Sequence, residues 1–184
     1  MHGIPTMGLR FFNVYGPRQS PSSPYSGVIS VLAARIVAGQ PLTIHGDGMQ
    51  TRDFVYVADV VSHLHAAMSL LHHAQLGGVL NVCTGRATSI RGLSEVLARA
   101  VGHTPEIVTS PARAGDIRHS LGDPSAATAL LGVRATTQLE EGLAAILQWI
   151  GDESCAGMTC APESNPGLVG ELASSGRSGC QESA

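Results

Sequence analysis

The sequence predicts an α/β fold with parallel strands. Residues 1–150 alternate strand-like and helix-like segments, which is typical of a parallel sheet with helices on its faces. The length of 184 residues allows one domain of ordinary size. Residues 151–184 hold only isolated apolar residues and no sustained period, too little to offset the entropy of ordering. We therefore expect a folded part over residues 1–150 and a disordered tail over residues 151–184.

The first element is a short apolar run, Gly8–Val14, which predicts a strand. A strand this apolar usually lies inside a sheet, and no strand segment precedes it, so we expect its neighbours to lie outside this sequence. Three prolines in the segment 15–24 predict a loop. The apolar spacing of Val28–Val37 then predicts a helix that ends at Gly39, a natural C-terminal cap.

The middle of the chain begins with a short strand at Pro41–Ile44 and a turn at Gly46–Gly48. The residues Thr51–Val57 form a β-rich run. Asp59 then opens a longer helix, which ends near His72 and His73. One face of this helix carries an apolar stripe made of Val60, Leu64, Ala67, Met68 and Leu71.

The last third of the folded part alternates in the same way. Val79–Val82 reads as a strand, and Ser89 and Gly102 cap the two ends of the next helix. A brief strand follows at residues 106–108. Two helices complete the pattern, one from Pro124 to Leu131 and one over residues 138–150.

Composition excludes several classes of function. The net charge of −3 gives no reason to expect binding to nucleic acid or to an anionic membrane. No run reaches the roughly 18 apolar residues of a membrane helix, and no signal pattern opens the chain, so we expect a cytoplasmic protein. The four cysteines lack metal-ligand spacing and read as unpaired thiols. All 11 basic residues are arginine, so chemistry that needs a lysine is excluded from this sequence.

Four polar residues are candidates for binding. Arg52 and Arg113 each lie beside turn-forming sequence, and a guanidinium offers a rigid fork of donors suited to a diphosphate. The alternative for each is a surface arginine paired with a nearby carboxylate such as Asp53. Asp116 reads either as an acceptor for a ribose diol or as an ordinary turn aspartate. Asn13 ends a strand where α/β sheets place ligand groups, or it caps the following loop.

A metal site is not expected. His63 and His65 are two residues apart on a helix and face different ways, and the pair His72 and His73 also diverges. We read all of them as exposed polar residues of that helix. No phosphate-loop motif and no GxGxxG dinucleotide motif occurs in the sequence.

Four segments in order carry a family resemblance. They read GIPTMGLRFFNVYGPRQSPSSPYSGVISVL, LTIHGDGMQTRDFVYVADVV, LNVCTGRATSI and RAGDIRHSLGD. Together they resemble the NAD-dependent epimerase/dehydratase family of extended short-chain dehydrogenases/reductases, in particular its UDP-glucose 4-epimerase-like members. The resemblance covers residues 2 to 150 and implies the C-terminal part of a Rossmann-like fold, together with the small subdomain that binds the sugar nucleotide.

The resemblance implies a role for each of ten residues. Phe12 would lie against the nicotinamide of NAD, and Asn13 would bind the sugar nucleotide, which the resemblance implies is UDP-linked. Gly27 and Val28 would line the substrate pocket, and Thr43, Ile44 and His45 would flank the uracil ring. Arg52 and Arg113 would hold the diphosphate, and Asp116 would take the ribose hydroxyls. The interpretation of Asn13, Arg52, Arg113 and Asp116 from the residues alone agrees with these implied roles.

The sequence departs from the family in what it does not contain. Members carry a glycine-rich NAD motif and a catalytic Tyr-x-x-x-Lys pair, and this sequence has no lysine. The family resemblance implies transient NAD-dependent oxidation at sugar C4, so we expect the substrate-binding portion of an epimerase that is inactive alone. Alternatives are a non-catalytic module that binds a nucleotide sugar, a non-functional gene fragment, and a 4,6-dehydratase as the parent reaction. Members often form homodimers, and the oligomeric state of this chain stays open.

Overall fold

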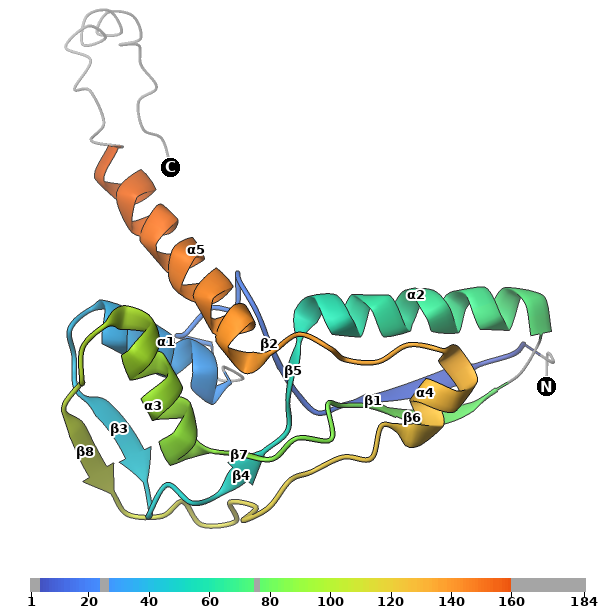
Figure 1. The fold of residues 1–184 in the computed structure, drawn as a ribbon, viewed down its shortest axis with the longest axis horizontal. Coiled ribbons are helices and arrows are strands. Elements are labelled where there is room, and N and C mark those ends of the chain that lie inside the picture. The colour runs from blue at the N-terminus through green and yellow to red at the C-terminus, as the bar shows by residue number, and fades with distance from the viewer. Residues whose placement is uncertain (1–3, 24–26, 75–76, 160–184) are drawn as a thin grey trace, which may run out of the picture.

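The computed structural model describes residues 4–23, 27–74 and 77–159 of the chain. Figure 1 shows an elongated molecule in which two lobes are joined by a narrow waist. The larger lobe contains α1 (Val28–Val37), β3 (Leu42–His45), α3 (Ile90–Val101), β8 (Ile107–Ser110) and α5 (Leu139–Thr159). The smaller lobe contains β1 (Met7–Phe11), α2 (Val57–Ala74), β6 (Gly78–Val82) and α4 (Ser125–Leu131). The waist contains β2 (Asn13–Tyr15), β4 (Thr51–Arg52), β5 (Phe54–Tyr56) and β7 (Thr88–Ser89).

The strands of the described residues form four pairs. The pairs β1–β6, β2–β5 and β3–β8 are parallel, and only β4–β7 is antiparallel. Each parallel pair is joined through at least one helix in chain order, as the right-handed crossover of an α/β fold requires. The predicted α/β fold with parallel strands is therefore confirmed.

The first predicted strand is two strands in the structure. β1 runs beside β6, with Leu9 opposite Leu80, whereas β2 runs beside β5, with Asn13 opposite Phe54. The change of partner falls at Phe12, whose N–H donates to the carbonyl of Val82 at 3.2 Å. The expectation that this strand has no neighbour within the sequence is wrong. Its partner β6 comes about 70 residues later by the register, a distance that no local pattern reveals.

The β-rich run at residues 51–57 is divided in the same way. Asp53 separates β4 from β5, and its carbonyl accepts the N–H of Asn13 at 3.0 Å. Helix α2 follows directly and begins at Val57, two positions earlier than predicted. Asp59 lies in its first turn, where the buried carboxylate accepts the N–H groups of Thr136 and Thr137 at 3.3 and 3.2 Å. Both predicted β segments are therefore divided within the waist, one at Phe12 and the other at Asp53.

The helix caps behave largely as predicted. The hydroxyl of Ser89 accepts the N–H of Gly92 at 3.0 Å at the start of α3, and Gly102 ends that helix at φ 75°. Gly39 follows α1 at φ 65°, in the left-handed conformation that a glycine cap requires. Helix α4 begins at Ser125, one residue after Pro124.

The last helix corrects the boundary expected at residue 150. Helix α5 continues through Ile150 to Thr159, so the first part of the expected tail is helical. Its apolar positions near Ile146 pack on the core, and no proline interrupts the helix after them, although Gly151 and Gly157 fall within it. The rest of the expected disordered tail, residues 160–184, lies outside the described residues.

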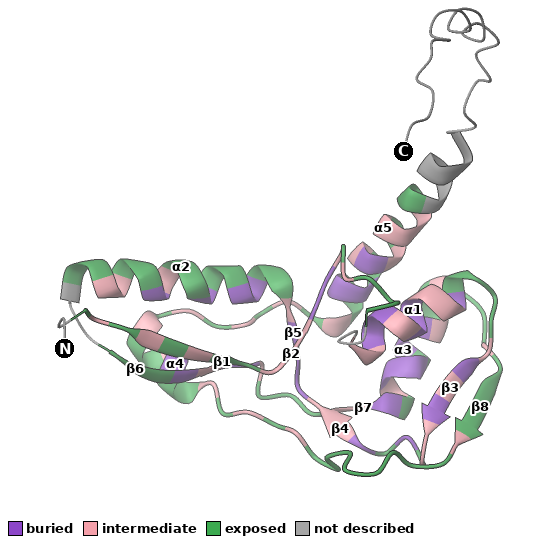
Figure 2. Ribbon diagram, turned by 180° about the vertical axis from the view of Figure 1, so that it is seen from behind, coloured by how far each residue is buried: buried purple, intermediate pink, exposed green. Residues whose placement is uncertain are grey.

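The hydrophobic core lies almost entirely in the larger lobe. Helices α1, α3 and α5 pack on one another and on β3, and Figure 2 shows buried residues gathered along their facing sides. Leu42 and Ile44 point from β3 into this core because alternate residues of a strand face opposite sides. Tyr15 enters from β2 at 3% exposure and packs edge-on against Phe54. The members of the cluster are Tyr15, Ile29, Leu32, Ala33, Ile36, Leu42, Ile44, Phe54, Ile90, Leu93, Val96, Leu97, Leu143 and Ile146.

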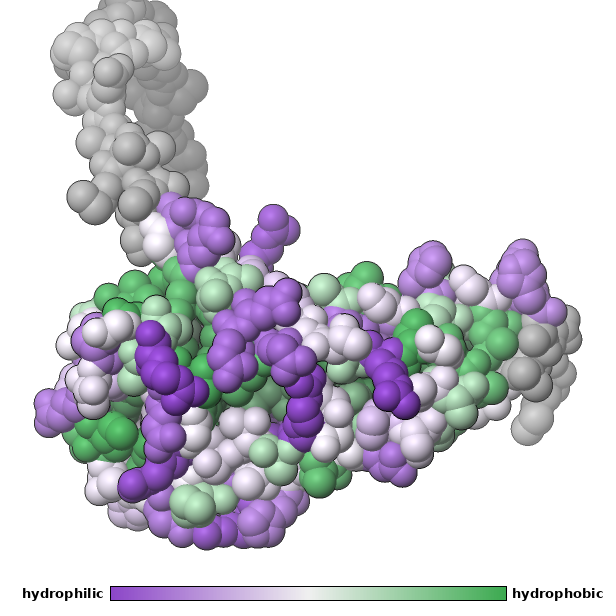
Figure 3. Space-filling model, viewed as in Figure 1, coloured by the Kyte–Doolittle hydropathy of each residue, from purple (hydrophilic) through white to green (hydrophobic). Residues whose placement is uncertain are grey.

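The smaller lobe is thinly packed. Its buried cluster joins Val60 of α2 and Val82 of β6 to Val55 of the waist strand β5. Helix α2 carries an exposed apolar stripe, in which Val61 and Met68 are 57% and 69% exposed. Figure 3 shows hydrophobic surface over α2 among hydrophilic side chains. In the described part of the chain, no helix is both long enough and apolar enough to cross a membrane.

Histidines on α2 have two different environments. His65, His72 and His73 are exposed, as predicted. The same prediction is wrong for His63, which is 1% exposed and whose Nδ1 lies 2.7 Å from the carbonyl of Asp59. This hydrogen bond within the helix satisfies the buried ring, so the burial of His63 is structural.

Asp53 is a buried carboxylate that ties the waist together. Its side chain is fully buried. One oxygen accepts the N–H and hydroxyl of Thr84, at 2.8 and 2.6 Å. The other accepts the N–H of Gly85 at 2.9 Å and that of Gly122 at 3.3 Å. Four donors thus satisfy the charge and join three segments that are distant in sequence.

Replacing Gly142 by alanine is expected to destabilise the larger lobe. A Cβ at this position would lie 2.5 Å from the Tyr15 hydroxyl oxygen and 2.7 Å from its ring. Overpacking of a buried site costs about 1–3 kcal/mol, which urea denaturation followed by circular dichroism can measure. Gly151→Ala on the same helix is the control, since nothing lies within 4 Å of its added Cβ. Equal midpoints for the two variants would contradict this packing.

Asp53→Asn is expected to loosen the waist. The amide places an N–H₂ group against backbone donors and removes the charge that strengthens their hydrogen bonds. We expect a loss of about 2–4 kcal/mol in the free energy of unfolding, measured by urea denaturation. Asp123→Asn serves as the control, because its exposed carboxylate accepts one N–H, from Ser125 at 2.9 Å. A loss no larger than that of the control would refute the role of Asp53.

Candidate functional site

A cavity of about 500 Å³ opens where the larger lobe meets the waist. Its walls come from one face of α1, the start of β2, the strands β3 and β4, and the segment that follows β8. The carboxyl end of β3 therefore lies at the cavity, the position where parallel α/β units usually place ligands, whereas β2 contributes its first residue. The lining residues are Asn13, Gly27, Val28, Val31, Leu32, Arg35, Thr43, His45, Gln50, Arg52, Ile90, Arg113 and Asp116.

Arg52 is held firmly in the cavity wall. Its side chain is 14% exposed and forms an ion pair with Asp116. The guanidinium also donates to the carbonyls of Thr51 and Ile117, at 2.7 and 2.6 Å. Pairing with a carboxylate was one of the two readings of Arg52, but the partner is Asp116, because Asp53 is occupied in the waist. Two predicted binding residues are thus in direct contact.

Arg113 lies on the same side of the cavity and contacts His45. The guanidinium Nη2 is 3.1 Å from Nε2 of His45. An arginine can only donate, so Nε2 must be the acceptor, and the ring proton then belongs on Nδ1. Nδ1 lies 3.3 Å from the carbonyl of Pro111, which can accept that proton. The imidazole of His45 thus bridges the Arg113 guanidinium and the backbone.

Sequence reasoning did not identify Arg35 as part of the site. It lies in the last turn of α1 and donates from Nη1 to the Thr43 hydroxyl at 2.8 Å and to the carbonyl of Pro41 at 3.1 Å. A basic residue there reads as a partner of the helix dipole, so its sequence position carried no signal for the site. The return of β3 beside α1 brings it into the cavity.

Gln50 was also missed. It is 9% exposed, and its amide nitrogen donates to the carbonyl of His45 at 2.9 Å. This bond anchors the turn that follows β3. The only sequence signal for Gln50 is that it is a polar residue close to the turn glycines.

Two predicted site residues do not line this cavity. Ile44 is 2% exposed and belongs to the core, because the alternation of β3 turns Thr43 and His45 toward the cavity and Ile44 away from it. A side-chain contact of Ile44 with a ligand in this cavity is therefore ruled out. Phe12 lies at the junction of β1 and β2, where it lines two other hollows together with Asn13.

The remaining residues predicted to bind substrate line the cavity. Asn13 was expected to end a strand, but it begins β2, because the strand changes partner at Phe12, and it lies at the cavity edge. Gly27 precedes α1 as its N-terminal cap, with its carbonyl accepting the Ser30 hydroxyl at 2.8 Å, and Val28 begins the helix beside it. Apart from Ile44, all the residues predicted to bind substrate thus line one cavity.

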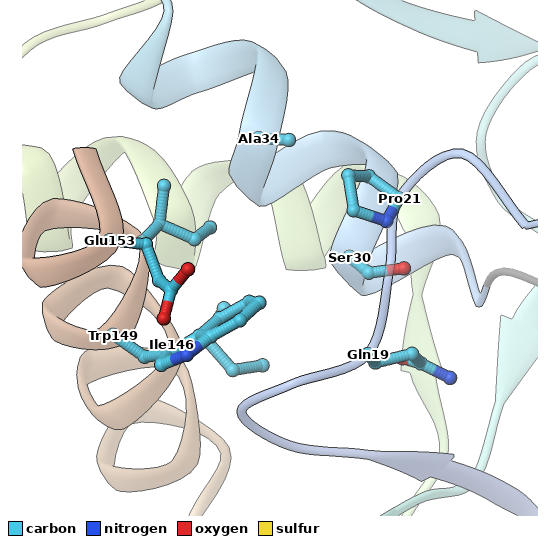
Figure 4. Close-up of a pocket in the computed structure, with 8 residues that line it drawn as sticks. Gln19, Pro21, Ser30, Ala34, Ile146, Trp149 and Glu153 are labelled. Atoms are coloured by element: carbon cyan, nitrogen blue, oxygen red, sulfur yellow. The ribbon is translucent and has the colours of Figure 1, made fainter. Parts of the chain in front are cut away.

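A second hollow, of about 290 Å³, lies between α1 and α5. Figure 4 shows Ile146, Trp149 and Glu153 of α5 on one side of it, facing Pro21, Ser30 and Gln19. Its walls are mostly apolar, and the Gln19 side-chain oxygen is buried there without a hydrogen-bond partner. No arginine is among the residues that line it, so it is unsuited to an anionic ligand.

The charge of the larger cavity favours an anion. Arg35, Arg52 and Arg113 line it against a single carboxylate, Asp116. Cys83 and Tyr15, which do not line this cavity, are poor nucleophiles. Burial raises the pKa of the Cys83 thiol to about 11, and it raises the pKa of Tyr15 well above its ordinary range. Among the described residues, no group of histidine, cysteine and acidic side chains is arranged to hold a metal ion.

Comparison with known proteins agrees with this geometry. The sequence model of the NAD dependent epimerase/dehydratase family matches residues 1–83. The UDP-glucose 4-epimerase of Mycolicibacterium smegmatis is 39% identical over 142 residues, which are 77% of this chain and 44% of that protein.

Two solved structures are similar in fold. The UDP-glucose 4-epimerase of Thermotoga maritima with UDP-glucose superposes with a TM-score of 0.72 at 36% identity, covering 81% of this chain and 46% of that one. MoeE5 in complex with UDP-glucose and NAD gives a TM-score of 0.71 at 38% identity, covering 79% and 47%. This chain therefore spans less than half the length of these relatives.

The order of the motifs, the parallel α/β pairs and these similarities lead to the same assignment. The family is named for NAD and its solved relatives hold it, so NAD is the cofactor that the family implies. The chain belongs to the NAD-dependent epimerase/dehydratase family of extended short-chain dehydrogenases/reductases.

Proposed function

We propose that this chain binds a UDP-linked sugar as the substrate-binding portion of a nucleotide-sugar 4-epimerase. The observation that carries the proposal is the convergence of Arg52, Arg113 and Asp116 with Asn13 and Thr43 in one cavity. These residues come from segments up to about 100 positions apart, and each is of a type that recognises part of a nucleotide sugar. The domain proposed for this role is residues 1–150.

The diphosphate is assigned to the arginines. A guanidinium donates two parallel N–H groups to phosphate oxygens, and such charge-assisted bonds are stronger than neutral ones. Arg52 is already oriented by two carbonyls, so little side-chain entropy remains to be lost when an anion binds. Arg113 lies three residues before Asp116, and its exposed guanidinium, which contacts the His45 imidazole, can reach an anion on its long stem.

The nucleoside is assigned to the β3 side of the cavity. Thr43 and His45 face inward from alternate positions of the strand, so a flat uracil ring can lie along them. Ile44 would contribute its backbone only. Asp116 supplies the acceptor for the ribose hydroxyls, and its ion pair with Arg52 holds that carboxylate beside the position assigned to the diphosphate. Asn13, Gly27 and Val28 would border the sugar.

The role of these residues in catalysis is to anchor the substrate. Contacts to the diphosphate are remote from the sugar carbon that reacts, and their binding energy positions the ring for chemistry elsewhere in the site. A substitution that weakens these contacts is therefore expected to lower the reaction rate as well as the affinity. Nothing in this anchor itself moves a proton.

The residues of this chain do not make a complete NAD site. Phe12 supplies one aromatic wall, and it lies beside the position of Gly122, where a Cβ would come within 2.7 Å of its ring. The sequence holds no glycine-rich dinucleotide turn, and without lysine it holds no Tyr-x-x-x-Lys pair. Hydride transfer is therefore not assigned to these residues. The second candidate is a module that binds a nucleotide sugar without catalysis, and the missing Tyr-x-x-x-Lys pair favours it. The reaction of the complete enzyme can equally be a 4,6-dehydration.

Removing either arginine is expected to weaken binding of UDP-glucose. Arg52→Ala and Arg113→Ala each delete a charged donor, which costs roughly 1.5–3 kcal/mol, or about 10-fold to 150-fold in Kd. Isothermal titration calorimetry on the 184-residue chain measures the change.

The matched control is Arg118→Ala. Arg118 lies in the same segment but outside the cavity, where it pairs with Asp47 at 2.7 Å and holds the pKa of that carboxyl well below its usual range. Its removal is expected to leave the Kd within about twofold. Unchanged affinity in both Arg52→Ala and Arg113→Ala would refute the diphosphate assignment. Failure of the natural chain to bind UDP-glucose at all would refute the proposed function itself.

A further inference from the structure

We propose that the hollow between α1 and α5 is a second binding site, which takes a small organic ammonium ion with an apolar body. The hollow has a volume of about 290 Å³, and none of its lining residues belongs to the cavity assigned to the nucleotide sugar. Pockets for small molecules begin near roughly 300 Å³, so this volume suits a ligand smaller than a typical drug. The proposal is independent of the function proposed for the larger cavity.

Two helix faces form most of the wall of this hollow. On α5 the lining residues recur three and four positions apart and therefore share one face: Ile146, Trp149, Ile150 and Glu153. On α1 the lining residues Ser30 and Ala34 are four positions apart. The substrate cavity uses other residues of α1, such as Val28 and Arg35, which lie on the other side of the helix. The two sites thus have α1 as a common wall and are separated by it.

Three oxygen atoms set the polarity of the hollow. Oε1 of Gln19 is buried, and no described residue donates a hydrogen bond to it. The Ser30 hydroxyl gives its hydrogen to the carbonyl of Gly27 at 2.8 Å, so its oxygen has only lone pairs to offer a ligand. Glu153 adds a carboxylate, and no arginine lines the hollow. An ammonium group supplies donors and charge to these acceptors, whereas an anion would meet the carboxylate without a compensating cation.

The rest of the wall suits an apolar body that carries such a cation. Trp149 lies four positions before Glu153 on the same face of α5, and Figure 4 shows both side chains at the hollow. The face of an indole ring attracts a cation, most strongly where water is excluded. Ile146 and Pro21 supply apolar surface against which the body of the ligand can be buried. Charge and shape therefore favour one class of ligand, an apolar molecule that ends in an ammonium group.

The loop that carries Gln19 has an unusual backbone conformation next to the hollow. Arg18, the preceding residue, has φ 70°, in the left-handed region that residues other than glycine rarely adopt. Such a conformation persists only where the surrounding structure fixes it, and it is common at binding sites. Because Arg18 directly precedes Gln19, its conformation sets the direction in which the Gln19 side chain leaves the backbone.

The test uses the fluorescence of Trp149, which is the single tryptophan of the chain and lines the hollow. Phenethylammonium chloride is titrated into the full 184-residue chain at about pH 7, where the amine is protonated. We expect a saturable change with a Kd on the order of 0.1 to 1 mM, as for other very small ligands. Phenethyl alcohol has the same body with a neutral donor and is expected to bind about fivefold more weakly. Hydrocinnamate, an anion of similar size, and sodium chloride at equal ionic strength are expected to give no saturable change.

Three variants test the assigned contacts. Gln19→Leu removes the buried acceptor and is expected to raise the Kd of phenethylammonium about fivefold to tenfold. Glu153→Gln removes an exposed charge, so its expected effect is smaller, about threefold. Asp152→Asn is the matched control, because this exposed carboxylate is the adjacent residue of α5 but does not line the hollow. Its Kd is expected to stay within about twofold of the natural chain. Equal Kd values for Gln19→Leu and Asp152→Asn would overturn the proposal.

The other outcomes separate this site from the substrate cavity. No saturable change with phenethylammonium, or equal binding of hydrocinnamate, overturns the proposal. Full displacement of the amine by UDP-glucose, or its loss in Arg52→Ala, would place the amine in the larger cavity and overturn the proposal while the proposed function stands. Fluorescence that varies with chain concentration alone, together with a dimer in analytical ultracentrifugation, would assign the hollow to a second copy of the chain and also overturn it. A chain that binds the amine but not UDP-glucose supports this site and refutes only the proposed function.

Discussion

The buried carboxylate of Asp53 is the interaction on which the arrangement of the site depends. It accepts four hydrogen bonds from Thr84, Gly85 and Gly122, and the carbonyl of the same residue accepts the N–H of Asn13. Asn13 lies beside Asp53 across the β2–β5 pair, and Arg52 precedes Asp53 in the chain. Both residues line the cavity. An ionised group in this position is tolerated only because every lone pair has a donor. Its charge therefore holds the two lobes in the orientation that forms the site.

The cavity itself combines rigid and adjustable cations. Arg52 and Arg35 are fixed by carbonyls, a hydroxyl and a carboxylate, and such multiple anchoring places their donors before a ligand arrives. Arg113 is exposed and its guanidinium contacts the His45 imidazole, so it is held less firmly than the other two. A site for a doubly charged diphosphate gains from both kinds, because preorganised donors lower the entropic cost of binding and a mobile one can close over the ligand.

The two lobes differ in how much apolar surface they bury, and the difference bears on what the chain can do alone. Three helices around β3 make a continuous core in the larger lobe, whereas α2 in the smaller lobe leaves Val61, Leu64 and Met68 exposed. Parallel strands are usually covered on both faces, and the β1–β6 pair is the smallest such unit. The chain also spans less than half of the relatives that it matches. The larger lobe, which carries the proposed nucleotide site, is thus the part with its own hydrophobic support.

Interactions between residues close in sequence determined most of the helices and strands, whereas the tertiary structure determined the site. Apolar spacing and capping residues were enough to predict α1 and α3 with their ends at Gly39 and Gly102, since these signals act within a few residues. The absence of lysine, and with it of the Tyr-x-x-x-Lys pair, is likewise a property of the sequence alone. The sequence could not show that Phe12 and Asp53 divide their strands, that His63 is buried, or that α5 runs past residue 150. Nor could it show that Arg52 pairs with Asp116, Arg113 with His45 and Arg35 with Thr43, because each contact joins segments that only the crossovers bring together.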